Sequence, residues 1–220
     1  MKHEDLEHIE QTAFFMVVQA LKDYAQEAAT IFREETDQPQ DIAEDITREA
    51  IEAMGLPGMR ERLYGKVDVK KAIYVFLPEP YPVALMVDAK AEKVNGDRTA
   101  TIQMSQTSMR VKMHRRGQTI DEAGKLSQVI QRGDHKFYVA TVVVKFVYEE
   151  TKTGYHLQRI IVACIPNGQL QEFYNPNADD TIWLAGRNAP TLGEDFRVRL
   201  SYARLREKAP WRVQMILLED

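Results

Sequence analysis

The sequence lacks several features that would assign it to a class of protein at once. Its one cysteine, Cys164, cannot form an internal disulfide, and the surrounding apolar stretch 160–165 favours a small buried side chain over a catalytic thiol. The first residues contain no apolar signal core, and no run approaches the roughly 18 apolar residues that a membrane span needs. Internal repeats and low-complexity tracts are also absent. We therefore expect a cytoplasmic protein, in a reducing compartment, that has no membrane partner.

The length and composition set the scale of the fold. A chain of 220 residues with 44% hydrophobic composition can bury one sizeable core and does not need two. We therefore expect a single domain over residues 1–220. Within it, a helical part (1–54) precedes a sheet core (63–165), which is followed by a long loop and a strand (166–220).

The small net charge of −4 hides an uneven distribution along the chain. Residues 1–52 have a balance of −10, which leaves +6 for residues 53–220. The acidic part is a poor candidate for contact with a polyanion and a better one for scaffold or subunit packing. The basic part contains two clusters, which are usually solvated surface charge but become candidates for phosphate contact if a site that acts on phosphates lies beside them. The members of the clusters are Arg110, Lys112, Arg115 and Arg116, and then Arg197, Arg199, Arg204, Arg206, Lys208 and Arg212.

Hydrophobic spacing predicts helices first and strands afterwards. Apolar residues three and four apart indicate a long amphipathic helix over 4–35 and a second helix over 41–54. Short segments rich in β-forming residues follow, which makes this an α/β chain. The expected strands are 63–69, 72–77, 83–91, 99–104, 137–148 and 157–165, and helical stretches are expected around 121–131 and 202–207. Residues 166–194 are expected to form a long structured loop, and such loops are commonly functional.

The strongest chemical signal is an acid two residues before a lysine at the end of a buried strand. This spacing occurs as Asp68/Lys70, Asp88/Lys90, Asp134/Lys136 and Glu150/Lys152. The last two lie in an evident turn and in a charged linker, where solvated surface pairs are the better interpretation. Asp88 and Lys90 follow the apolar run 83–87 and point to one face of an extended chain. If the segment that ends near Asp68 pairs with this strand, two carboxylates and an ammonium meet at a site able to cleave a phosphodiester.

These residues also support a family resemblance. The chain resembles the SfiI-type restriction endonucleases, a branch of the PD-(D/E)XK nucleases that also includes BglI. Segments that look like family segments occur in the same order over nearly the whole chain, although Val67 replaces the usual proline before Asp68. They are VQAL (18–21), AEDIT (43–47), VDAKA (87–91), YNP (174–176) and PWR (210–212). The resemblance implies a mixed sheet flanked by helices, with the catalytic residues in the sheet core and DNA recognition in the segment 166–220.

The site implied by the motif binds Mg²⁺ through hard oxygen ligands. Asp68 and Asp88 would hold the ion, with the main-chain carbonyl of Ala89 as a third ligand. Lys90 would position or deprotonate the attacking water and stabilise the transition state. Asp45 or Glu49 could add an outer-shell ligand, but a solvated helix flank explains both residues equally well.

Sequence-specific reading needs rigid donors in a groove of the DNA. Arg197 and Arg199 lie two apart on an expected strand, so both could grip guanine edges in the major groove. The family match makes Arg187 and Asn188 secondary candidates, and Arg98 could contact a base or the backbone. Exposed surface ion pairs are the alternative for all of them, and for Arg187 and Asn188 the two interpretations are equally supported.

The resemblance further implies what the protein acts on and with. Relatives cut double-stranded DNA at interrupted G/C-rich palindromes and leave 5′-phosphates and 3′ overhangs. A palindrome is naturally read by a two-fold homodimer, although a homotetramer is also open, and a cognate DNA methyltransferase would protect the host. Two other functions remain open on the residues alone: a repair or junction-resolving nuclease with the same core, and a non-catalytic DNA-binding module.

Overall fold

The computed structural model describes residues 2–54, 61–62, 72–76, 82–96, 98–152, 154–185 and 196–218. Among these residues, three helices, α1 (His3–Asp23), α2 (Ala25–Glu34) and α3 (Pro39–Ala53), precede all the strands, and two short ones, α4 (Gln171–Tyr174) and α5 (Tyr202–Lys208), lie later in the chain, before its last strand. The strands are β1 (Glu61–Arg62), β2 (Ala72–Phe76), β3 (Val83–Lys93), β4 (Thr99–Gln103), β5 (Val111–Arg115), β6 (Gln118–Glu122), β7 (Val129–Arg132), β8 (His135–Glu150), β9 (Tyr155–Ile165), β10 (Trp183–Leu184), β11 (Arg197–Ser201) and β12 (Val213–Leu217). Four 3₁₀ turns connect them, η1 (Val94–Gly96), η2 (Met104–Gln106), η3 (Gly168–Leu170) and η4 (Pro210–Arg212).

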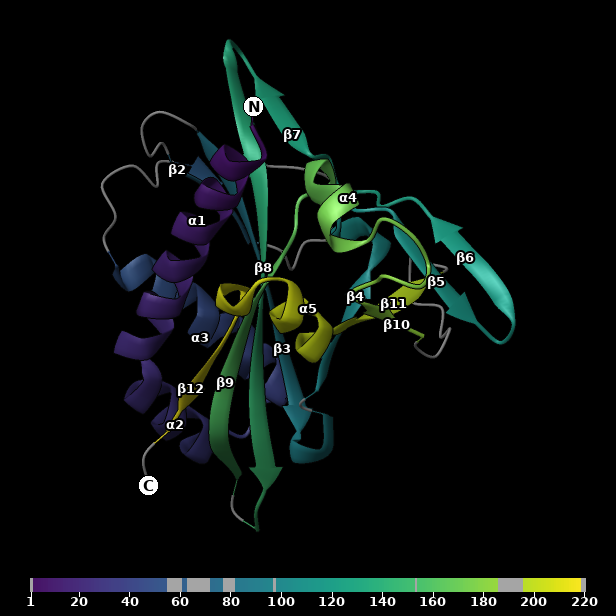
Figure 1. The fold of residues 1–220 in the computed structure, drawn as a ribbon. Helices are drawn as coiled ribbons and strands as arrows, with labels where there is room; N and C mark the ends of the chain where they lie inside the picture. Colours follow the sequence, from purple (N-terminus) through teal and green to yellow (C-terminus); the bar gives the residue numbers. More distant parts are fainter. Residues whose placement is uncertain are drawn as a thin grey trace.

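A mixed sheet forms the centre of the molecule, as the resemblance implied (Figure 1). Its strand order among the described residues is β1-β2-β3-β8-β9-β12, with β7 paired to the start of β8. β3 and β8 are parallel, and the other neighbours are antiparallel. Both faces of β3 and β8 are covered, which explains their nearly continuous apolar sequences.

The helices α1, α2 and α3 cover one face of this sheet (Figure 1). Their apolar stripes pack against the residues of β3 that alternate from Val83 to Ala89 and against the matching residues of β8 and β9. The single helix expected over 4–35 is wrong, because the hydrogen-bond pattern breaks at Tyr24 and divides it into α1 and α2. The Tyr24 hydroxyl donates to Glu49 of α3 at 2.9 Å. The apolar stripe continues through the break, so spacing alone could not reveal it.

The other face supports a small antiparallel sheet with the order β10-β11-β4 (Figure 1). Its apolar residues, including Ile102, Val198 and Leu200, form a second core with Val143 and Val147 of β8. The central sheet therefore lies between the helical layer and this small sheet. Asp88 and Lys90 alternate with the residues that face the helices, so their side chains face the small sheet's side.

The expected helix over 121–131 is also wrong. Residues Gln118–Glu122 form β6 in a hairpin with β5, and Val129–Arg132 form β7 in a hairpin with β8. Positive φ values at Arg116, Gly117 and Gly133 mark the two turns. Cross-strand pairing thus overrides the local signal. The expected helix after residue 201 is confirmed as α5, and the described part of the loop after residue 165 contains η3, α4 and β10.

None of the helices in the described part of the chain combines the length and the apolar composition that are needed to cross a membrane.

Candidate active site and DNA-reading face

Asp88 and Lys90 lie together on β3, as their spacing predicted. The Lys90 ammonium is 2.6 Å from Asp88 Oδ2, and the two side chains are only 16% and 18% exposed. Asp88 Oδ1 accepts a hydrogen bond of 2.6 Å from the side-chain amide of Gln106. Among the described residues, Oδ2 is buried and accepts no hydrogen bond, because the ammonium approaches it as an ion-pair partner outside hydrogen-bond geometry. The carboxylate is therefore held at one oxygen, and its other oxygen faces a cation.

The third predicted member of this site, Asp68, lies outside the described residues. Within the described residues, no three acidic, histidine or cysteine side chains gather as a metal site would require. Asp88 thus supplies one carboxylate to the described half of the site, and the main-chain carbonyl of Ala89 lies beside it in sequence on β3.

The Ala89 carbonyl is fixed by a side chain from α3. Gln40 Nε2 donates to this carbonyl at 2.8 Å, and Gln40 Oε1 accepts from the Ala91 N–H at 3.1 Å. β2 pairs with β3 from Val83 to Val87. Beyond that stretch, the Gln40 carboxamide bonds to the main chain of β3 in the way that a neighbouring strand would. Gln40 Nε2 also donates to Glu44 at 2.8 Å.

Two acids of α3 that were considered as outer-shell ligands are engaged elsewhere. Asp45 pairs with Arg48 at 2.8 Å, and Glu49 accepts from the Tyr24 hydroxyl at 2.9 Å. The acid on the side of α3 that faces β3 is Glu44, one turn beyond Gln40. Glu44 lies one helical turn after Gln40, so the period of the helix places both on one side. The sequence could have identified Glu44 in this way only if the contact between Gln40 and β3 had been known.

A second lysine occupies the same face of the sheet, and the sequence analysis did not select it. Lys145 of β8 has a fully buried side chain whose ammonium donates to the carbonyls of Gly96 and Thr99 and pairs with Glu92. The ammonium also lies 6.0 Å from the centre of the Tyr202 ring. Lys145 therefore fastens the segment between β3 and β4, and the start of α5, to the central sheet.

The predicted reading arginines share one face of the small sheet. Val198 and Leu200 of β11 are buried in the second core, so Arg197 and Arg199 point to the opposite face, where Arg199 is exposed. The register pairs Arg199 with Thr101 and Arg197 with Gln103. Thr101 and Gln103 are therefore additional members of this face, and the polar–apolar alternation of residues 99–103 is the signal that could have identified them.

The remaining reading candidates divide into two groups. Arg98 is exposed one residue before β4, and its carbonyl accepts from the Tyr202 N–H at 3.3 Å. This places it at the end of the small sheet opposite to Gln103. Arg187 and Asn188 lie outside the described residues.

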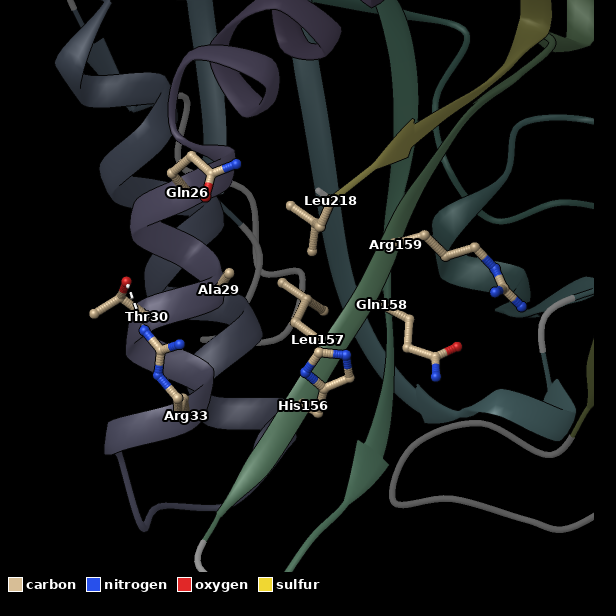
Figure 2. Close-up of a pocket in the computed structure, with 9 residues that line it drawn as sticks. All are labelled: Gln26, Ala29, Thr30, Arg33, His156, Leu157, Gln158, Arg159 and Leu218. Atoms are coloured by element: carbon tan, nitrogen blue, oxygen red, sulfur yellow. Dashed lines mark hydrogen bonds between the residues drawn. The ribbon is translucent and has the colours of Figure 1, made fainter. Parts of the chain in front are cut away.

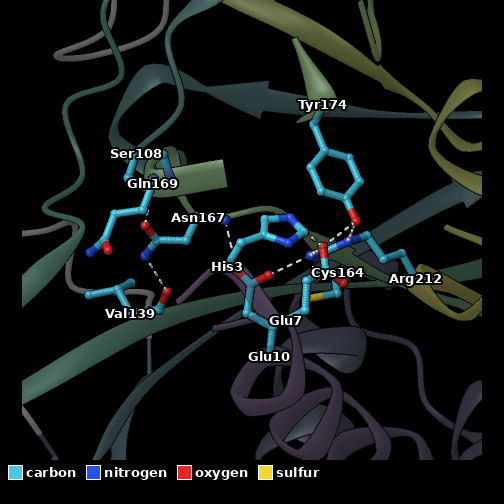
Figure 3. Close-up of polar contacts among 11 residues, drawn as sticks. His3, Glu7, Glu10, Ser108, Val139, Cys164, Asn167, Gln169, Tyr174 and Arg212 are labelled. Carbon is cyan, nitrogen blue, oxygen red and sulfur yellow. Dashed lines mark hydrogen bonds and ion pairs between the residues drawn. The ribbon is translucent and has the colours of Figure 1, made fainter. Parts of the chain in front are cut away.

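The C-terminal basic cluster does not form a single charged surface, because Arg212 is buried. Its guanidinium pairs with Glu10 at 2.6 Å and with Glu7 at 2.8 Å, and its Nε donates to the Tyr174 hydroxyl at 2.7 Å (Figure 3). Glu10 also accepts from the Asn167 N–H at 2.7 Å. This polar cluster joins α1 to the turns after β9 and α5. Arg212 thus stabilises the fold and is not a candidate for phosphate contact.

Burial controls the ionisation of this cluster. It raises the pKa of the Glu10 carboxyl, against the opposing influence of the Arg212 guanidinium. It also raises the pKa of the Tyr174 hydroxyl. Cys164 lies next to Arg212 and is fully buried, and burial raises the pKa of its thiol well above the ordinary range. The predicted role of Cys164 as a small buried side chain is confirmed.

A pocket of about 630 Å³ lies between α2 and β9, on the helical side of the sheet (Figure 2). Arg33 and Thr30 of α2 and His156 and Leu157 of β9 are among its lining residues. Neither Asp88, Lys90 nor any predicted reading residue lines it. This pocket is therefore separate from the pair of Asp88 and Lys90 and from the predicted reading residues.

Comparison with known proteins identifies the family of this chain. A family model described as type II restriction enzyme SfiI matches residues 9–216. The type II restriction enzyme SfiI of Streptomyces fimbriatus is 32% identical over 230 residues, which cover 96% of this chain and 84% of that protein. The chain belongs to the SfiI family of type II restriction endonucleases. It is therefore a site-specific deoxyribonuclease of a family that generally depends on a divalent metal ion.

Two solved structures extend the likeness to three dimensions. Tetrameric restriction endonuclease SfiI bound to cognate DNA has a TM-score of 0.86 at 29% identity, covering 100% of this chain and 86% of that chain. Restriction endonuclease BglI bound to its DNA recognition sequence has a TM-score of 0.72 at 16% identity, covering 98% and 91%. The BglI likeness shows the fold alone. Together, the matches confirm the predicted SfiI-type resemblance, the mixed-sheet fold and the endonuclease activity.

Proposed function

We propose that this endonuclease hydrolyses double-stranded DNA in a Mg²⁺-dependent reaction at an interrupted, G/C-rich palindrome and leaves 5′-phosphates and 3′ overhangs. Asp68, Asp88 and the Ala89 carbonyl would hold the ion, and Lys90 would act beside them. The observation that carries the proposal is the largely buried Asp88 carboxylate, which is held at Oδ1 by Gln106 and faces the Lys90 ammonium, 2.6 Å away, at Oδ2.

The described residues fit a divalent cation. A buried carboxylate costs free energy unless a positive charge accompanies it; the Lys90 ammonium, 2.6 Å from Oδ2, supplies one here, and a bound cation would add to it. Carboxylate and carbonyl oxygens are the hard ligands that Mg²⁺ prefers, and Mg²⁺ sites use few carboxylates because the ion keeps several waters. The chemistry that Mg²⁺ supplies when bound is acidification of water and neutralisation of charge on the phosphate.

The chain connection supports Asp68 as the second carboxylate. Ala72, the first residue of β2, is the register partner of Val87, which precedes Asp88. Asp68 stands four residues before Ala72, a span of at most about 14 Å. The connection is therefore short enough to allow Asp68 to approach Asp88.

The other side chains would orient the reacting groups. The Lys90 ammonium, only 18% exposed, can donate to a phosphate oxygen or to the attacking water in a site from which much solvent is excluded. Gln40 fixes the Ala89 carbonyl through its hydrogen bond of 2.8 Å. Groups held in place by such contacts would need little reorganisation during the reaction.

The reading face would set the specificity. Arg197 and Arg199 would contact guanine edges in the major groove, with Arg98 on a base or the backbone and Arg187 and Asn188 as secondary contacts. A palindrome presents the same half-site twice, so a two-fold homodimer would place one active site on each strand. The solved SfiI relative is tetrameric, which makes a homotetramer the alternative assembly. A cognate DNA methyltransferase would protect the host genome.

Digestion of phage DNA with Mg²⁺, followed by sequencing of the fragment ends, tests the proposal. We expect one defined sequence with a 3′ stagger, and loss of cleavage by roughly 10³-fold in Asp88→Ala, because metal catalysis supplies several kcal/mol. Asp134→Ala is the matched control, since Asp134 and Lys136 have the same spacing in an exposed turn. Nicking that depends on DNA structure would indicate a repair or junction-resolving enzyme instead. Binding without cleavage would indicate a non-catalytic module.

A further inference from the structure

A buried glutamine connects the catalytic carboxylate to the reading face. Gln106, at the end of η2, is 4% exposed. Its Nε2 donates to Asp88 Oδ1 at 2.6 Å, and its Oε1 accepts from the Gln103 N–H at 2.9 Å. A backbone N–H can only donate, so the amide oxygen must face Gln103 and the amide nitrogen must face the carboxylate. The orientation of the amide is therefore set by its two partners.

Gln103 is the last residue of β4 and the register partner of Arg197. One residue pair further along the same face, Thr101 is the partner of Arg199. The reading strand β11 is thus joined through β4 and a single side-chain amide to the carboxylate of Asp88. A displacement of the end of β4 would move the amide, and the amide would turn the carboxylate.

The hydrogen bond also sets which oxygen of Asp88 faces which partner. Oδ1 accepts from the Gln106 amide, whereas Oδ2 faces the Lys90 ammonium. Without the amide, the carboxylate could rotate about its terminal torsion, which is a soft two-fold coordinate. A ligand oxygen that is free to rotate binds a metal ion more weakly than one held by a second hydrogen bond.

We propose that Gln106 is a positioning residue that couples base reading by Arg197 and Arg199 to the orientation of Asp88, so that cognate DNA favours the metal-binding arrangement of the site. This inference rests on the proposed function and adds a route by which recognition controls cleavage. Gln106 acts through Asp88 and touches neither the DNA nor the reacting atoms.

Two substitutions separate this role from simple packing. Gln106→Met has similar volume but neither hydrogen bond. Gln106→Glu keeps an oxygen that accepts from the Gln103 N–H, which preserves η2. A buried carboxyl beside Asp88 readily takes up a proton and could then donate, so this variant is assayed from pH 7 to 9, and the ionised form at the high end of that range cannot donate to Asp88. Gln131→Met is the matched control, because the Gln131 amide bonds to the Gly133 carbonyl in the exposed hairpin of β7 and β8.

The decisive measurements are metal affinity and discrimination. Mg²⁺ and Ca²⁺ binding is measured by calorimetry on the intact protein, with and without the duplex whose sequence the fragment ends provide. We expect Gln106→Met to weaken metal binding by roughly 10- to 100-fold, as for other substitutions of residues that orient a metal ligand. Affinity for the cognate duplex in EDTA should stay within about twofold, because no DNA contact is lost.

In both Gln106 variants, the ratio of cleavage at the cognate site to cleavage at a one-base mismatch should fall by roughly 5- to 150-fold, the usual range of coupling between sites.

Each result decides the inference. Unchanged metal affinity and unchanged discrimination in Gln106→Met, in a variant that circular dichroism shows to be folded, would overturn it. If Gln106→Met does not fold, the discrimination ratio of Gln106→Glu decides, and a ratio equal to that of the wild type overturns the inference. If the wild type itself does not cleave DNA, the proposed function fails, while the calorimetric comparison still tests whether Gln106 orients Asp88. A similar change in Gln131→Met would show a nonspecific effect and would also count against it.

Discussion

Lys90 and Lys145 are register partners on the parallel strands β3 and β8, so two lysine side chains lie next to each other on one face of the sheet. Their surroundings differ. Lys90 is 18% exposed and faces Asp88, whereas the fully buried Lys145 bonds to Glu92 and to two main-chain carbonyls. Each ammonium has its own carboxylate, which limits the repulsion between the two. We infer that Lys90 serves the reaction and Lys145 serves the structure.

Replacing each lysine by methionine should separate these roles. Lys145→Met should lower the free energy of unfolding by about 2–3 kcal/mol, because two carbonyls lose a charged donor; half-exposed Glu92 adds little, since solvent screens its charge. Lys90→Met should lower the free energy of unfolding less, by about 1–2 kcal/mol, because Asp88 loses its counter-charge but keeps the Gln106 hydrogen bond and is not fully buried, and it should abolish cleavage. Urea denaturation and a DNA cleavage assay measure both variants. Equal destabilisation by the two substitutions would contradict this division.

Part of the central sheet and the juxtaposition of two candidate site residues could be predicted from local sequence. The apolar run 83–87 predicted β3, and the two-residue spacing of Asp88 and Lys90 predicted a shared face because strands have a period of two. The same reasoning predicted that Cys164 is buried. These predictions depend only on properties of neighbouring residues.

The supporting residues could not be predicted in this way. Gln106 contacts Asp88 across 18 positions, and Gln40 contacts Ala91 across 51 positions. A lone glutamine has no spacing signal, so only the folded arrangement identifies it. Arg212 was misread for a related reason, because its partners Glu7 and Glu10 are about 200 positions away. The error over residues 121–131 shows the same limit, since β6 and β7 exist through pairing with other strands.

Arg199 should contribute to base discrimination more than a surface arginine does. Arg199→Ala should weaken cognate binding by about 1–3 kcal/mol and relax specificity at one base pair, because a bidentate grip on guanine is lost. Arg199→Lys should not restore the specificity, since an ammonium lacks the planar fork. Arg33, exposed on α2 in the acidic helical part, provides the control substitution Arg33→Ala. Fluorescence anisotropy with cognate and singly substituted duplexes measures the effect. A uniform loss over all duplexes would assign Arg199 to the backbone instead.

Cys164 should make the stability of the protein sensitive to alkaline pH. The folded thiol has a pKa raised by burial, so it keeps its proton at a pH where the unfolded thiol, with a pKa of roughly 8.5, releases its own. Its contribution to stability is therefore present below that pH and is lost as the pH rises, by up to about 1.4 kcal/mol per pH unit. Urea denaturation from pH 7.5 to 9.5 should show a steeper decline for the wild type than for Cys164→Ala. Parallel curves would contradict the assignment, as would rapid reaction of the native thiol with an alkylating reagent.

The pair of Glu10 and Arg212 should behave as a buried charge pair in which each partner depends on the other. Both side chains are fully buried, so Arg212→Met leaves the Glu10 carboxylate without its counter-charge and should cost about 3–5 kcal/mol at pH 8. Adding Glu10→Gln to that variant should recover about 1–3 kcal/mol, because the amide oxygen still accepts from the Asn167 N–H and no charge remains buried.

The cost of Arg212→Met should also be smaller at pH 5 than at pH 8. Burial raises the pKa of the Glu10 carboxyl and loss of the guanidinium raises it further, so the folded variant takes up a proton as the pH falls. Urea denaturation of the single and double variants at both pH values tests this, with Glu7→Gln as the control, since the Glu7 side chain is 20% exposed. If Glu10→Gln lowered the stability of Arg212→Met further, the cost would come from lost packing of the long arginine side chain and not from the isolated carboxylate.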